Sequence, residues 1–97
     1  MTQMPPIEHV RSGHGGTFVA ARDGKRLAWM TYTLDGQRAV IEHTEVDDAL
    51  RGTGAGRKLV DAAVQWARAG NVKLHPVCSY AASAFDKVPE YADVLAP

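Results

Sequence analysis

The first half of the chain either alternates apolar and polar positions or is rich in β-branched and aromatic residues. Both patterns are typical of β-strands. Asp-Gly pairs at 23–24 and 35–36 favour two-residue hairpin turns. The glycine-rich segment 12–16 has the composition of a flexible loop. We therefore predict an antiparallel meander of four strands, at residues 7–11, 17–21, 26–34 and 38–46.

Beyond residue 56 the apolar residues are spaced by three and four, which indicates an amphipathic helix over residues 57–68. Its apolar positions are Leu59, Val60, Ala63, Val64 and Ala67. Gly70 is expected to cap the C-terminal end of this helix. Residues 72–77 predict a fifth strand, in which Pro76 favours a strand end or a sheet edge. Short helical segments are expected at 81–87 and 89–95.

This order of elements predicts an α+β fold. The fourth strand, the helix and the fifth strand form a βαβ unit, which should be right-handed with its two strands parallel. We therefore expect a mixed sheet, in which the meander leads into one parallel pair, followed by a short C-terminal helix. With 97 residues the chain is long enough for a single domain, spanning residues 1–97.

The composition of the chain argues against some classes of binding partner. Lys plus Arg number 11 and Asp plus Glu number 11, so the formal net charge is zero, whereas nucleic-acid-binding domains usually carry a basic excess. No apolar run approaches the roughly 20 residues of a membrane span. Residues 1–6 lack the pattern of a secretory signal. We expect neither a nucleic acid nor a membrane as partner, and a cytoplasmic location.

The chain has a single cysteine, Cys78, which excludes an internal disulfide and fits a reducing compartment. The histidines and Cys78 show no metal-ligand spacing such as C-x₂-C, so no metal site is expected. A domain of this size has a small core, and both a monomer and a homodimer remain open.

Three glycines, at positions 52, 54 and 56, lie between the fourth predicted strand and the helix. Backbone N–H groups in such a loop and at a helix start can approach a phosphate group closely. Arg51, Arg57 and Lys58 add positive charge on both sides. The loop therefore predicts an anion site, and the alternative is a glycine-rich turn that binds nothing.

Two common nucleotide motifs do not fit this loop. A Rossmann fingerprint would require glycine at position 57, which is Arg57. A P-loop would require a hydroxyl at position 59, which is Leu59. We therefore expect NAD and ATP to be poor ligands.

The segment from Val46 to Val60 reads VDDALRGTGAGRKLV, in which a strand ending in valine and an acidic pair precede Arg-x-x-Gly-x-Gly. It resembles the pyrophosphate-binding segment of the GNAT superfamily, the acetyl-CoA-dependent N-acetyltransferases. The segments 41–46 (IEHTEV) and 76–80 (PVCSY) look like those of a minimal GNAT-like family without helices between its first strands. The resemblance covers residues 7–95, with one departure: Val88 stands where that family has a histidine.

The resemblance implies a GNAT-like acyltransferase fold and transfer of an acetyl group from acetyl-CoA to a primary amine. The main chain at the end of the fourth strand would pair with pantetheine, and the glycine loop would hold the pyrophosphate through backbone amides. The cofactor-binding residues implied are Val46, Arg51, Gly52, Thr53, Gly54, Ala55, Gly56, Arg57 and Lys58.

Four residues are candidates for the chemistry. Similar minimal members suggest that Cys78 is an acyl-accepting nucleophile, and the alternative is a small buried packing residue. His43 and Glu45 share one side of the fourth strand, where His43 is the better candidate to activate Cys78 and Glu45 could act as a base. Either could instead be an ordinary sheet residue. Tyr80 would return a proton to the CoA thiolate or pack as a lid on pantetheine.

A second class of function remains open. The glycine loop would serve a non-catalytic CoA or acyl-CoA binding or sensing module equally well. Cys78 and its neighbours are the feature that distinguishes the two classes. The sequence does not identify the acceptor, which could be a small amine, a peptide or a protein lysine.

Overall fold

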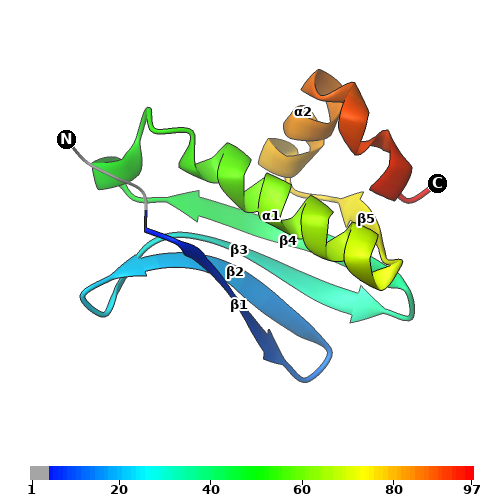
Figure 1. Ribbon diagram of the computed structural model, residues 1–97, viewed down its shortest axis with the longest axis horizontal. Helices are drawn as coiled ribbons and strands as arrows, with labels where there is room; N and C mark the ends of the chain where they lie inside the picture. The colour runs from blue at the N-terminus through cyan, green and yellow to red at the C-terminus, as the bar shows by residue number, and fades with distance from the viewer. Residues whose placement is uncertain (1–4) are drawn as a thin grey trace.

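The computed structural model describes residues 5–97, so residues 1–4 of the segment that lacks a secretory pattern lie outside the described residues. Five strands form one sheet in the order β1-β2-β3-β4-β5, and α1 lies across one face of it (Figure 1). The strands are β1 Ile7–Ser12, β2 Gly15–Arg22, β3 Lys25–Asp35, β4 Arg38–Val46 and β5 Lys73–Pro76. The helices are η1 Asp48–Leu50, α1 Ala55–Gly70, α2 Ser79–Lys87 and η2 Pro89–Val94.

Each of the first three strands pairs with the next in antiparallel fashion, and β5 pairs with β4 in parallel after the crossover through α1. The predicted α+β fold with a meander and one parallel pair is confirmed. The flexible loop expected at residues 12–16 is wrong, because Ser12 and Gly15 are paired strand residues. Gly15 and Gly16 lie so close to Tyr32 on β3 that neither position has room for a side chain.

Helix α1 begins two residues earlier than its apolar pattern indicates. Gly54 precedes it with a φ of 79° and provides no side-chain cap. The predicted C-terminal cap at Gly70 is wrong by one residue. Gly70 is still helical, and Asn71 takes the left-handed conformation at φ 54°, with its N–H donating to the Ala67 carbonyl oxygen. Asparagine tolerates this conformation better than most residues.

The core lies between α1 and the face of the sheet that it covers. All five predicted stripe residues of α1 are buried, with at most 1% of their surface exposed. Burial of one Leu or Val side chain stabilises the fold by about 1.5–3 kcal/mol, so this stripe holds α1 on the sheet. The largest fully buried side chains are Met30, Ile41, Leu50, Leu59, Leu74, Val60 and Val64.

The C-terminal part covers the sheet at its β5 edge, with α2 and η2 beside α1 (Figure 1). Strand β5 is shorter than the predicted 72–77, and Pro76 ends it, as expected for an edge strand. Helix α2 begins at Ser79 rather than Ala81, and the last segment is a 3₁₀ helix. Arg68 on α1 pairs with Asp93 at 2.8 Å and so attaches η2. No helix within residues 5–97 is long and apolar enough to span a membrane.

Candidate functional site

The two parallel strands separate at Ile41. Strand β5 pairs with β4 only as far as the Ile41–Pro76 pair. Beyond this point the Ile41 carbonyl oxygen accepts from the N–H groups of both Val77 and Cys78, at 3.0 Å each. Residues 42–46 of β4 therefore have no neighbouring strand on the β5 side. The residues of the glycine loop lie beside this opening.

A β-bulge in β4 lies at the same level. Tyr32 pairs with Ile41 and Thr31 pairs with His43, so Glu42 is an extra residue with no opposite residue in the β3 register, although its carboxylate accepts from the Thr33 hydroxyl. A bulge reverses the side-chain alternation beyond it. Ala39 and Ile41 point into the core before the bulge, and Thr44 and Val46 take the same face after it.

A cavity of about 320 Å³ lies at this opening. Its lining comes from three places: the end of β4, the segment from η1 into α1, and the first turn of α2. The lining residues are Thr44, Val46, Leu50, Arg51, Gly52, Gly54, Ala55, Gly56 and Tyr80. None of them is a carboxylate, so the only formal charge in the lining is the positive charge of Arg51.

The loop leading into α1 presents its backbone to this cavity. Gly52 and Gly54 have φ values of 83° and 79°, which residues with side chains rarely adopt. The first N–H groups of an α-helix have no carbonyl partner within the helix, and the helix dipole makes this end positive. Because no side chain caps the start of α1, these donors remain available to an anion.

Gly56 serves a different purpose from the other two glycines. It has no positive φ, and a Cβ atom there would lie 2.5 Å from the Tyr80 ring and its hydroxyl oxygen. The missing side chain therefore allows Tyr80 to lie against the first turn of α1. Tyr80 is 45% exposed and forms one wall of the cavity.

The structure divides the predicted cofactor residues into two groups. Six of them line the cavity: Val46, Arg51, Gly52, Gly54, Ala55 and Gly56. The other three do not. The Thr53 hydroxyl donates to the Leu50 carbonyl oxygen within the turn. Arg57 lines a separate cavity, and the exposed side chain of Lys58 lines none of the cavities described here.

Cys78 lies two residues beyond the end of β5, just past the strand as the sequence pattern predicts, and caps the N-terminus of α2. Its Sγ atom accepts from the Ala81 N–H at 3.4 Å. It also lies 3.3 Å from Oγ1 of Thr44, which lines the cavity. Cys78 is half-buried and is a free thiol. The side chain of Thr44 therefore links the cavity to this sulfur.

His43 and Glu45 share one side of β4, as the strand period predicts, and form an ion pair of 2.9 Å. The expected approach of His43 to Cys78 is wrong. His43 pairs with Thr31 on the face opposite Thr44, and the side chains of His43 and Glu45 are 57% and 50% exposed. The physical reason is the bulge at Glu42, which turns Thr44 rather than His43 toward the sulfur.

Thr44 and Leu50 are lining residues that sequence reasoning did not single out. The sequence carries no parity signal for Thr44, because Ala39, Val40 and Ile41 are all apolar and show no alternation that Val46 could interrupt. Across residues 5–97 no group of three or more His, Cys, Asp and Glu side chains could hold a metal ion.

The sequence and the fold of this chain are similar to those of known proteins. Residues 17–94 match the sequence profile of the GCN5-related N-acetyltransferases. Protein NATD1 from Gallus gallus is 34% identical over 73 residues, which are 72% of this chain and 66%, just under two thirds, of that protein. A GCN5-like protein from Staphylococcus aureus, solved by NMR, is 35% identical with a TM-score of 0.73, over 92% of this chain and 87% of its own.

A more distant structure shares the fold. A crystal structure from Bacillus anthracis, described as a streptothricin acetyltransferase in complex with acetyl coenzyme A, has a TM-score of 0.58 and 23% identity. The match covers 78% of this chain and 47% of that one. The profile match spans most of the chain, including the glycine loop, Cys78 and Tyr80. The chain therefore belongs to the family of GCN5-related N-acetyltransferases.

Proposed function

We propose that this protein binds acetyl-CoA in the cavity at the β4–β5 opening and transfers the acetyl group to a primary amine. The observation that carries the proposal is the cavity itself, in which the uncapped start of α1 meets the end of β4, which has no neighbouring strand on the β5 side. The first offers N–H donors to a diphosphate. The second offers main-chain groups to the amides of pantetheine, as in strand addition.

The residues present fit this cofactor. The cavity lining contains no carboxylate that would repel a diphosphate. The Arg51 guanidinium lies at the rim and pairs with Asp48 at 2.9 Å, with both side chains largely exposed. An exposed pair of this kind is weak, so Arg51 can exchange its partner for a phosphate at little cost.

We further propose that Cys78 accepts the acetyl group before the amine does. The Cys78 sulfur would attack the thioester carbonyl carbon, forming a new carbon–sulfur bond while the bond to the CoA sulfur breaks. The thiol proton then passes to the departing CoA thiolate, for which the Tyr80 hydroxyl is a candidate carrier. The acceptor amine attacks the acetyl-Cys78 carbonyl next, and its proton returns to the Cys78 sulfur.

Two contacts support this role. The Ala81 N–H and the Thr44 hydroxyl both lie within hydrogen-bond range of Sγ. Each can stabilise negative charge that develops on the sulfur during attack and release. No imidazole or carboxylate lines the cavity, so direct transfer would require water to carry the amine proton to a more distant base such as Glu45.

The test is the intact mass of the protein after incubation with acetyl-CoA alone. We expect an increase of about 42 Da, the mass of one acetyl group replacing a proton in covalent catalysis. The mark should be absent in Cys78→Ser and removed by hydroxylamine. Ser79→Ala, which changes the neighbouring hydroxyl, should still be labelled. Because the chain has one cysteine, a labelled Cys78→Ser protein would contradict the nucleophile.

A thermal-shift titration separates binding from chemistry. CoA should raise the melting temperature of the wild type, since a ligand that binds only the folded state stabilises it. Gly54→Asp should lose this shift, because it places a carboxylate beside the expected diphosphate. A wild type that shows no shift at millimolar CoA would contradict the cofactor assignment itself.

The second candidate is a non-catalytic CoA or acyl-CoA binding module. The exposed position of His43 and Glu45, away from the cavity, favours it. This candidate predicts a thermal shift with CoA but neither a mass increase nor amine acetylation. The same two experiments therefore distinguish the two functions.

A further inference from the structure

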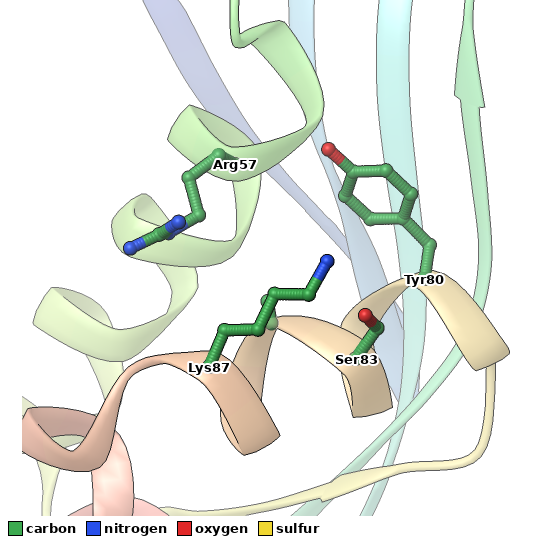
Figure 2. Close-up of a pocket in the computed structure, with 5 residues that line it drawn as sticks. Arg57, Tyr80, Ser83 and Lys87 are labelled. Carbon is green, nitrogen blue, oxygen red and sulfur yellow. The ribbon is translucent and has the colours of Figure 1, made fainter.

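A second cavity, of about 130 Å³, lies on the other side of Tyr80. It is lined by Arg57, Tyr80, Ser83, Ala84 and Lys87 (Figure 2). Tyr80 also lines the cavity at the β4–β5 opening, so one aromatic ring separates the two cavities. Tyr80 is the only residue that lines both cavities.

The second cavity is built by one face of α2 and the first turn of α1. Tyr80, Ser83, Ala84 and Lys87 are spaced by three, one and three residues, which places them on the same side of α2. Arg57 directly follows Gly56 in α1. In Figure 2 the Lys87 side chain extends from α2 toward α1, and the Ser83 hydroxyl comes from the same face of α2.

The charges in this cavity are not balanced. Lys87 and Arg57 contribute two cations, and Tyr80 and Ser83 contribute hydroxyl donors, but no carboxylate lines the cavity. In the part of the chain from residue 5 onward, neither cation takes part in an ion pair, and the Arg57 guanidinium lies 5.9 Å from the centre of the Tyr91 ring. Cations and hydroxyls that line one cavity without a counter-charge are the groups that bind phosphate.

We propose that the second cavity binds the 3′-phosphate of CoA, so that Arg57 and Lys87 distinguish CoA from dephospho-CoA. The inference rests on the proposed function, since it assigns a second group of the same ligand. In CoA the diphosphate and the 3′-phosphate are attached to one ribose, at its 5′ and 3′ carbons. Two anion sites for this molecule must therefore be neighbours, which is the arrangement on either side of Tyr80.

The position of Arg57 fits the assignment of the diphosphate and the 3′-phosphate to different cavities. The backbone of the first turn of α1 lines the cavity at the β4–β5 opening, where it can bind the diphosphate. The Arg57 side chain, from the same turn, lines the second cavity, where it can bind the 3′-phosphate. A lysine holds a phosphate as a point charge, and an arginine holds it through the hydrogen-bonding fork of its guanidinium. At an exposed site both contacts are sensitive to salt.

The experiment is an isothermal titration of the full chain with CoA and with dephospho-CoA, which lacks only the 3′-phosphate. For the wild type we expect dephospho-CoA to bind about tenfold more weakly, the effect of losing one charge-assisted contact at a partly exposed site. Arg57→Gln and Lys87→Gln should weaken CoA binding toward the dephospho-CoA value and leave dephospho-CoA binding unchanged. Arg26→Gln, which removes one positive charge on β3 outside both cavities, should keep the full difference.

Competition experiments with adenosine 3′,5′-bisphosphate and with inorganic phosphate identify the anion that the second cavity binds. Competition by the bisphosphate in the wild type and its loss in Lys87→Gln would support the 3′-phosphate. Competition by inorganic phosphate alone would overturn it in favour of a free-phosphate site. Equal binding of CoA and dephospho-CoA by the wild type would also overturn the inference, and the proposed function would stand. Failure of both to bind would instead contradict the proposed function, from which the inference follows.

Discussion

The Sγ atom of Cys78 lies 3.3 Å from the Oγ1 atom of Thr44, across the opening where β5 leaves β4. The two residues are separated by 34 positions in the chain and come from different sides of the α1 crossover. Their contact joins the first turn of α2 to the end of β4. It also connects the thiol to a residue that lines the cavity.

Replacing Thr44 by Val tests this contact, because the change removes the hydroxyl and keeps the branched shape. A lost hydrogen bond costs about 0.5–1.5 kcal/mol, so we expect acetylation of Cys78 to slow by a factor of about 2 to 10. The rate is measured from the intact mass at timed intervals after mixing with acetyl-CoA. Thr31→Val, on the opposite face of the sheet, is the control and should leave the rate unchanged. An unaltered rate in Thr44→Val would mean that the hydroxyl has no part in the reaction.

Gly54→Ala tests the conformation of the loop in the absence of ligand. The position has a φ of 79° but open space around it, so backbone strain is the only penalty. We expect a loss of about 1–2 kcal/mol in the free energy of unfolding, measured by urea denaturation. Gly70→Ala is the matched control: its Cβ would meet Val72 Cγ2 at an ordinary 3.7 Å and φ is not positive, so stability should not fall. Equal effects of the two substitutions would show that the loop is not strained.

Gly56→Ala should act through Tyr80 instead of the backbone. The added methyl group would overlap the Tyr80 ring and move it away from α1. Overpacking of this kind costs about 1–3 kcal/mol. In a protein that already carries Tyr80→Ala, adding Gly56→Ala should cost much less stability than it costs in the wild type. A double-mutant cycle measures this difference. Strictly additive effects would indicate that the two residues do not meet.

His9 should make the stability of the protein depend on pH. Its ring stacks on Phe18 at 4.2 Å between centroids, and its Nε2 atom lies 2.5 Å from the Tyr32 hydroxyl. Burial lowers the pKa of His9 below its ordinary value of 6.5, and the nearby Arg11 lowers it further. Between the two pKa values the unfolded chain binds more protons than the folded protein, so stability should fall as the pH drops below about 6.5.

The measurement is the melting temperature between pH 8 and pH 5, a range that spans the histidine titration. His9→Phe, which keeps the ring stacking but cannot ionise, should flatten this dependence. His75→Gln changes an exposed histidine on β5 and should retain the wild-type slope. A wild-type slope that persists in His9→Phe would assign the dependence to other groups.

Local periodicity explains which parts of the fold could be predicted. The stripe from Leu59 to Ala67 correctly predicted α1, and the Asp-Gly pair at 23–24 correctly predicted the turn between β2 and β3. The pair at 35–36 predicted the next turn one residue too early, because Asp35 still pairs with Arg38 and the turn consists of residues 36–37. Segment ends were less predictable, because they depend on contacts made by other parts of the chain. Helix α2 begins at Ser79 because the Cys78 sulfur accepts from the Ala81 N–H, and cysteine is not a usual capping residue.

The candidate site also depends on contacts between distant parts of the chain, which limits what the sequence predicts about it. The glycine pattern located the loop, in which Gly52 and Gly54 take positive φ values that favour glycine. Regular alternation, however, assigned His43 to the thiol, and one inserted residue at Glu42 reverses that assignment. The contact between Gly56 and Tyr80 spans 24 positions, and no local pattern predicts which side chain fills the space above a helical glycine.

The order of the strands has a consequence for how the molecule opens. Every antiparallel pair joins strands that are consecutive in the chain, so the meander closes only short loops as it folds. Only the β4–β5 pair closes the longer loop through α1, and it is the shortest pairing in the sheet. We expect β5 and α2 to detach first in native-state hydrogen exchange, while the meander stays protected. Their departure would remove Cys78 and Tyr80 from the opening, so a bound ligand that contacts both sides should slow exchange in this C-terminal part most.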